Sequence, residues 1–296
     1  MSPRVPGTGR PWHDALTGYA FVGLSLIGVV GFLLVPVVVV IGISLFHWDL
    51  VSPARFIGLD NYRVILTDPA FGRSLLVTAS FVLLVVPTEI VLGLFLAVLL
   101  HRRLPGSVAF RVIFALPWIS APLALGVVWK WIFDPSDGAL NALIGHRIEW
   151  LSSPTLALPS VAAVSIWMHV GYVALFYLAG LAGIPEQYHE AARIDGASSG
   201  QTLWRITLPL LRPTTFFVLT TNVITTVQTF DTVYAMTQGG PAGSTDVVAS
   251  LIYKEAFTSF RMGRAASMSV VLFVLLVAVT LAQQQYFRQR ITYEIG

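Results

Sequence analysis

The 296-residue chain is 55% hydrophobic and only 11% charged, and its mean hydropathy is +0.76. Soluble domains carry about 25% charged residues, so this composition excludes a water-soluble globular protein. The formal charge of +3 gives no indication of nucleic-acid binding, and the lack of cysteine excludes disulfides, thiolate metal sites and a cysteine nucleophile. We therefore interpret the chain as an all-α integral membrane protein.

In chain order, residues 1–18 are polar and rich in proline and glycine, which predicts an N-terminal tail. Apolar segments then alternate with polar loops, and about 20 apolar residues cross the roughly 30 Å hydrocarbon layer. The fifth segment is more polar, but polar groups are tolerated where a helix faces a pathway or a partner. We expect one transmembrane domain over 19–287, followed by a tail at 288–296. Its six predicted spans are 19–46, 74–100, 112–133, 157–183, 210–234 and 265–287.

The orientation follows from lysine and arginine in short loops, which favour the cytoplasm. The counts on the two sides are close, but the outer charges alternate with acids. Arg102, Arg103 and Arg111 cluster tightly after the second segment. This cluster places both termini and the loop 184–209 in the cytoplasm.

The loop 184–209 is the most patterned polar stretch between two apolar segments. Pro185 suits the start of a helix, and Gly196 takes the left-handed conformation that ends one. Ser198 with Gln201 three residues later forms a capping box, which begins a second short helix through Arg205. We expect a helix–glycine–helix elbow between two spans.

The elbow resembles the EAA loop of membrane subunits of ATP-binding-cassette (ABC) importers. The matching residues are Glu190-Ala191-Ala192, Gly196 after three residues, and Ile206-x-Leu208-Pro209 after nine more. The alternative is an ordinary amphipathic loop. In that family the elbow is the coupling helix, which sits in a groove on the ATPase subunit. The resemblance implies that the coupling residues are Glu190, Ala191, Ala192, Asp195, Gly196, Ile206, Leu208 and Pro209.

Other stretches are similar to the carbohydrate branch of the same family. They are Val128–Phe133, Leu178–Leu181 and Gly239-Gly240-Pro241. The resemblance implies a type I importer fold in a multi-pass bacterial cell-membrane protein. It also implies a second, non-identical permease subunit, two ATPase subunits and an extracytoplasmic solute-binding protein or lipoprotein.

Catalysis has no support in the sequence. A Walker A loop needs Gly-Lys-Ser/Thr, but the two lysines, Lys130 and Lys254, follow Trp129 and Tyr253. The chain also lacks HExxH, GxSxG and a His/carboxylate set at metal-ligand spacing. We expect no cofactor in this chain and no enzyme activity, with ATP and magnesium bound by partner subunits.

The polar residues within the spans are the candidates for a substrate pathway. In the fifth span they recur at three- and four-residue steps, so many share one helical face. Hydroxyl and amide groups both donate and accept hydrogen bonds, which suits a polyhydroxylated solute. The alternative is bonding to neighbouring helices or to their own backbone. The candidates are Asn222, Thr225, Gln228, Thr229 and Asp231, together with Glu89 in the second span.

Glu89, and His169 in the fourth span, each have a structural alternative to a pathway role. A carboxylate at mid-span costs on the order of 3 kcal/mol, so Glu89 faces a cavity or a partner, or forms a buried structural pair. His169 is either a pathway residue or a helix–helix contact. The absence of an arginine deep in a span favours a neutral di- or oligosaccharide or an amino sugar. A glycerol-phosphate-type solute and an ion-coupled secondary transporter are the alternatives.

Overall fold

The computed structural model describes residues 19, 22–23, 25–101 and 106–288. The described chain is mostly helical, with one small antiparallel pair of strands in which Phe46 lies opposite Phe56. The predicted tails fall largely outside the described residues, as do Arg102 and Arg103. In chain order the elements, with π-helices marked η, are η1 Val30–Leu34, α2 Val35–Ser44, β1 Phe46–His47, β2 Arg55–Phe56, α3 Asp60–Thr67, α4 Pro69–His101, α5 Ser107–Ile119, α6 Pro122–Ile132, α7 Ala139–Ile144, α8 Ala157–Ala182, α9 Glu186–Ile194, α10 Ser199–Thr202, η2 Leu203–Thr207, α11 Leu208–Leu210, α12 Arg212–Val227, α13 Asp231–Met236, α14 Val248–Tyr253, η3 Lys254–Thr258 and α15 Met262–Arg288.

Four helices of the described chain are long and apolar enough to cross a membrane. They are Ser25–Ser44, α4, α8 and α15, and a fifth span results if α5 and α6 count together. The predicted span 157–183 corresponds to α8 within one residue, and 265–287 corresponds to α15 within three. Helix α4, which corresponds to the second predicted span, begins at Pro69, five residues before the predicted start. The count of six spans stays a prediction.

The third predicted span, 112–133, is not one straight helix. The chain bends by 96° between α5 and α6. Ser120 and Ala121 are extended there, with ψ angles of 155° and 117°, directly before Pro122. The proline ring disfavours the helical conformation of the preceding residue, so α5 ends and α6 begins with Pro122 in its first turn.

The fifth predicted span, 210–234, is also interrupted. Helix α12 ends at Val227 and α13 begins at Asp231. Near the break the Thr229 hydroxyl donates to the Thr225 carbonyl at 3.4 Å, while the Thr229 amide donates to Thr226 instead. The threonine side chain thus takes the carbonyl that its own amide would bond in an α-helix, which favours a helix end.

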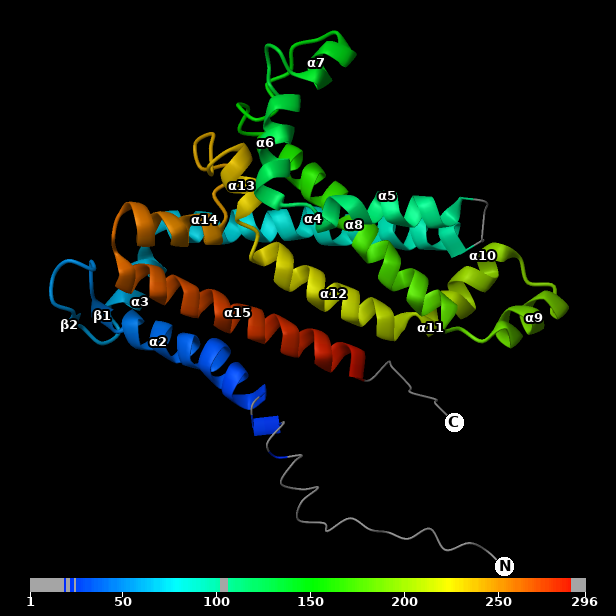
Figure 1. Ribbon diagram of the computed structural model, residues 1–296, viewed down its shortest axis with the longest axis horizontal. Helices are drawn as coiled ribbons and strands as arrows, with labels where there is room; N and C mark the ends of the chain where they lie inside the picture. The colour runs from blue at the N-terminus through cyan, green and yellow to red at the C-terminus, as the bar shows by residue number, and fades with distance from the viewer. Residues whose placement is uncertain (1–18, 20–21, 24, 102–105, 289–296) are drawn as a thin grey trace, which may run out of the picture.

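Helices α4 and α8 form the centre of the molecule and pack along each other (Figure 1). One apolar cluster joins them to α13 through residues such as Phe81, Met168 and Met236. A second joins them to α12, with Tyr177 and Leu211 fully buried. Helices α2 and α15 lie side by side along one flank, while α6 and α7 rise from the other.

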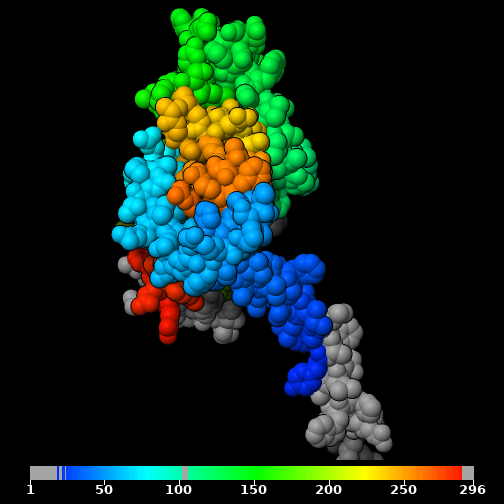
Figure 2. All heavy atoms as spheres, turned by 90° about the vertical axis from the view of Figure 1, so that its left-hand side faces the viewer, coloured from blue at the N-terminus to red at the C-terminus, as the bar shows by residue number. Residues whose placement is uncertain are grey.

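The elbow helices α9 and α10 lie at one end of the molecule, and α3 with the strand pair lies at the other (Figure 1). Figure 2 looks onto this second end, where the segment around α14 lies between α6–α7 and α3. The elbow is thus held away from the α13–α14 region by the length of the central helices.

Candidate functional site

The elbow forms as the local sequence predicts. Pro185 precedes α9 in an extended conformation, and Gly196 after it has φ +74°. The Ala197 amide donates to the Ala192 carbonyl at 2.9 Å, which closes the end of the helix. Ser198 then begins α10 with a complete capping box, because its Oγ accepts from the Gln201 amide and its own amide donates to Gln201 Oε1 at 2.8 Å.

The second arm of the elbow is longer than predicted. The helix does not end at Arg205 but continues through η2 and α11 to Leu210. Pro209 lies inside this helical stretch rather than ending it. The turns just before Pro209 are π-helical, over Leu203–Thr207, and the Thr207 hydroxyl donates to the Thr202 carbonyl at 3.3 Å.

The predicted coupling residues divide by exposure. Glu190, Ala191 and Asp195 are exposed, whereas Ala192 is buried. Ile206, Leu208 and Pro209 are half-buried on the second arm. Two large apolar side chains beside the motif face outward, since Ile194 is 86% and Trp204 72% exposed. The elbow therefore presents a charged and apolar surface that this chain leaves uncovered.

The pathway candidates on α12 and α13 also divide. Thr225, Gln228 and Asp231 are exposed and Thr229 is half-buried, whereas Asn222 is buried. The Thr225 hydroxyl donates to the Thr221 and Asn222 carbonyls at 3.0 and 3.1 Å. Such bonding to the helix's own backbone was the alternative to a pathway role. Because the Thr225 hydroxyl already donates its hydrogen, it can only accept a hydrogen bond from a solute.

Glu89 lies inside the chain rather than on an open face. Its side chain is 2% exposed, and its Oε1 is 3.6 Å from His169 Nδ1 on α8. The same ring nitrogen lies 2.9 Å from the Ser165 carbonyl. The structure thus brings together two residues that the sequence treated separately, in a contact between α4 and α8.

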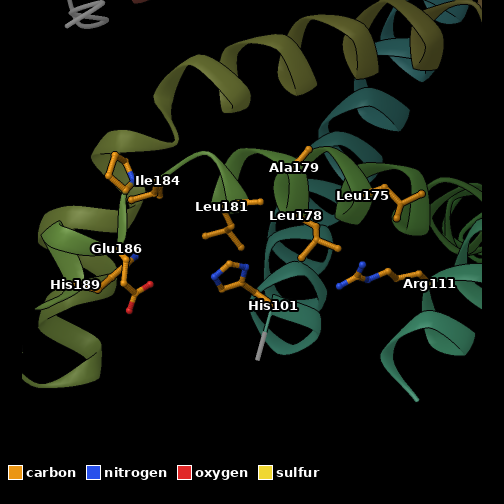
Figure 3. A pocket seen from close by; sticks show the side chains of 11 residues that line it. His101, Arg111, Leu175, Leu178, Ala179, Leu181, Ile184, Glu186 and His189 are labelled. Carbon is orange, nitrogen blue, oxygen red and sulfur yellow. The ribbon is translucent and has the colours of Figure 1, made fainter. Parts of the chain in front are cut away.

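A cavity of about 1040 Å³ beside the elbow was not predicted. Figure 3 shows His101 from α4 and Arg111 from α5 pointing into the space below α8, with Glu186 and His189 from α9 at its other side. Sequence reasoning used Arg111 only for orientation. The sequence did contain one indication of this cavity, because basic residues lie at the end of the second apolar segment and at the start of the third.

Within the described part of the chain, no group of three or more His, Cys, Asp or Glu residues could hold a metal ion. The fold and the projecting elbow define a helical membrane component of a transport system.

The chain belongs to the family of binding-protein-dependent transport system inner membrane components, whose model matches residues 89–293. This confirms the family expected from the sequence, and it places the chain in the inner membrane. The chain is 36% identical to the probable ABC transporter permease protein YesP of Bacillus subtilis, over 90% of this chain and 89% of that protein. It is 34% identical to the sn-glycerol-3-phosphate transport system permease protein UgpA of Agrobacterium fabrum, over 81% of this chain and 83% of that protein.

A third relative is the trehalose/maltose transport system permease protein MalF of Thermococcus litoralis, which is 32% identical over 94% of this chain and 96% of that protein. Among solved structures, a bacterial ABC transporter that imports the acidic polysaccharide alginate superposes with a TM-score of 0.80. That match covers 96% of this chain and all of the other, at 22% identity. The likeness confirms the type I importer permease fold.

Proposed function

We propose that this chain is one of two non-identical permease subunits of an ATP-driven importer that moves a sugar or sugar derivative into the cell. Relatives in the trehalose/maltose system of Thermococcus litoralis and the sulfoquinovosyl glycerol system of Agrobacterium fabrum support the carbohydrate class. The observation that carries the proposal is the elbow, which stands exposed at one end of the bundle. A partner is needed to cover it.

Two ATPase subunits are the proposed partners at the elbow, and they would bind ATP and magnesium. Glu186 is already engaged, because its Oε1 lies 3.0 Å from Arg193 Nη2. Glu190 is exposed and forms no ion pair among the described residues. It is therefore available to bond the ATPase groove.

In this proposal the elbow and both termini lie in the cytoplasm. Closure of the ATPase subunits on ATP would pull α9, and the continuous second arm would pass that movement to α12. Tilting of packed helices is an established way to change which side of a membrane a site faces. An extracytoplasmic solute-binding protein would deliver the solute at the opposite end.

The exposed side chains Thr225, Gln228 and Asp231, at the end of α12 and the start of α13, are the proposed contribution of this chain to the solute path. Its hydroxyl, amide and carboxylate groups can bond sugar hydroxyls. Glu89 and Asn222, which are buried in this chain, would reach the solute only if the helices part.

A second candidate solute is a glycerol phosphate, because UgpA of Agrobacterium fabrum is 34% identical. A phosphate ester calls for a cation along its path, and after Arg212 the residues 213–236 contain no lysine or arginine. A neutral sugar therefore fits this part of the chain better. Uptake of labelled maltose against sn-glycerol 3-phosphate by the reconstituted complex separates the two.

The test of coupling is ATPase activity of the co-expressed, purified complex with its solute-loaded binding protein. Glu190→Ala should lower the stimulated activity by at least about tenfold, because a lost charge-assisted hydrogen bond is worth roughly 1.5–3 kcal/mol. Gln187→Ala, exposed on the same helix, is the matched control and should leave it unchanged. A chain that purifies alone and moves solute without ATP would show instead an ion-coupled transporter.

A further inference from the structure

The cavity beside the elbow lies where three membrane-embedded helices end. His101 is the last residue of α4, and Arg111 lies in the second turn of α5. The rest of the wall comes from the end of α8 and the beginning of α9. Its volume of about 1040 Å³ far exceeds that of a few water molecules. The cavity thus lies at the level where a helix leaves the hydrocarbon for the membrane surface.

The polar side of this cavity is basic. His101, Arg111 and His189 enter it from three different helices, and within the described residues none of them forms an ion pair. Glu186, the one acidic residue among the described lining residues, has its carboxylate bonded to Arg193. Arg111 Nε is buried and has no hydrogen-bond partner in the described part of the chain. An arginine stays charged and presents its donors as a planar fork, so this site lacks an anionic acceptor.

The other side of the cavity is apolar. Leu175, Leu178 and Leu181 from α8 line it, and Figure 3 shows Leu178 and Leu181 above the space into which His101 and Arg111 point. A small soluble anion would use only the basic groups and would leave the leucines exposed. A ligand with a phosphate at one end and an alkyl chain at the other would use both surfaces.

We propose that an anionic phospholipid binds in this cavity, with its phosphate on Arg111, His101 and His189 and an acyl chain along the leucines of α8. Basic pockets between helices at the cytoplasmic side of a membrane are known to bind lipid head groups. The inference rests on the proposed function only for placing this end of the bundle in the cytoplasmic leaflet. Because His189 belongs to α9, the bound lipid would also tie the elbow to the ends of α4 and α5.

The test is lipid retention by the complete purified complex in neutral detergent, measured by native mass spectrometry after incubation with phosphatidylglycerol or phosphatidylcholine vesicles. The wild type should retain phosphatidylglycerol in preference to phosphatidylcholine. Arg111→Gln should reduce this retention about fivefold, the loss expected for one basic contact near the membrane surface. His189→Gln, on the exposed elbow, should reduce it in the same direction without disturbing the packed helices.

Arg288→Gln is the matched control, since Arg288 is an exposed basic residue at the end of α15 and does not line the cavity. Its retention should equal that of the wild type. Equal retention in all variants would overturn the proposal, since the lipid would then bind through general membrane charge. Displacement of the lipid by millimolar inorganic phosphate or glycerol phosphate would also overturn it, because the occupant would then be a soluble anion. Solute-stimulated ATPase activity of the same samples tests the importer separately, so either conclusion can fail without the other.

Discussion

Glu89 Oε1 and His169 Nδ1 lie 3.6 Å apart in the contact between α4 and α8. One turn further along both helices, a Cβ on Gly93 would collide with the side chain of Val173. The two helices therefore run in the same direction in close register, and the absence of a side chain at Gly93 permits that approach. The carboxylate and the imidazole are held together by this packing, which favours the structural interpretation of Glu89.

Glu89→Gln should therefore be tolerated. Glutamine keeps the size and one acceptor oxygen, and it removes a carboxylate that costs on the order of 3 kcal/mol at mid-span. We expect a free energy of unfolding that is unchanged or raised by up to about 3 kcal/mol, whereas Glu89→Ala should lower it by about 2–3 kcal/mol through an unfilled cavity. The thermal unfolding midpoint of the purified complex checks both.

The matched control for Glu89→Gln is Asp231→Asn, an exposed carboxylate that should have little effect on stability. Solute uptake adds a second measurement. A higher KM for the solute in Glu89→Gln, with stability unchanged, would contradict the structural role and return Glu89 to the pathway.

Gly171 marks a second close approach, in which α8 meets the backbone of α5. A Cβ at this position would overlap the carbonyl oxygen of Phe114. Gly171→Ala should lower the free energy of unfolding by about 1–3 kcal/mol, because a main-chain atom cannot rotate away. Gly72→Ala in α4, where a Cβ meets nothing within 4 Å, should be neutral or stabilise by up to about 1 kcal/mol. Similar midpoints for the two variants would show that α5 moves freely against α8.

The parts of the fold that could be predicted are those that local sequence determines. The left-handed Gly196 and the capping box of Ser198 with Gln201 depend on neighbouring residues, and both form as expected. Helix α8 matches its predicted range because a long apolar run leaves few alternatives in a membrane. The bend before Pro122 could have been predicted from the proline itself, which hydropathy alone does not take into account.

The parts that could not be predicted depend on which helix faces which. The sequence indicates that Glu89 is unusual, but only the α4–α8 register places it against His169. The basic cavity combines His101, Arg111 and His189 from three helices. Their separation along the sequence does not predict that they meet in one cavity. The break between α12 and α13 depends on side-chain hydrogen bonds within a run of threonines, which hydropathy does not describe.

The turn at Asp134 predicts a pH dependence outside the spans. The amides of Asp137 and Ser136 donate to Asp134 Oδ1 at 3.0 and 2.8 Å, and they hold the pKa of Asp134 below its usual 3.8. A lowered folded pKa means that this contribution is complete above about pH 4 and is lost as the pH falls through the folded value. Asp134→Ala should lower the unfolding midpoint at neutral pH, and the difference from the wild type should shrink below pH 4. Asp137→Ala is the matched control, because it changes an exposed neighbour and keeps the backbone amide that donates to Asp134.

Gly196 gives the sharpest test of the elbow. Its φ of +74° disfavours any residue with a Cβ, while a Cβ built there meets nothing within 4 Å. Substitutions therefore act through backbone conformation alone. Gly196→Val should cost about 1–2 kcal/mol locally and change the angle between α9 and α10, whereas Gly196→Asn should be tolerated because asparagine accepts the left-handed region. ATPase activity stimulated by the loaded binding protein should fall in the valine variant and persist in the asparagine variant, with equal amounts of both proteins in the membrane. Full stimulated activity in Gly196→Val would mean that the elbow angle does not transmit the movement.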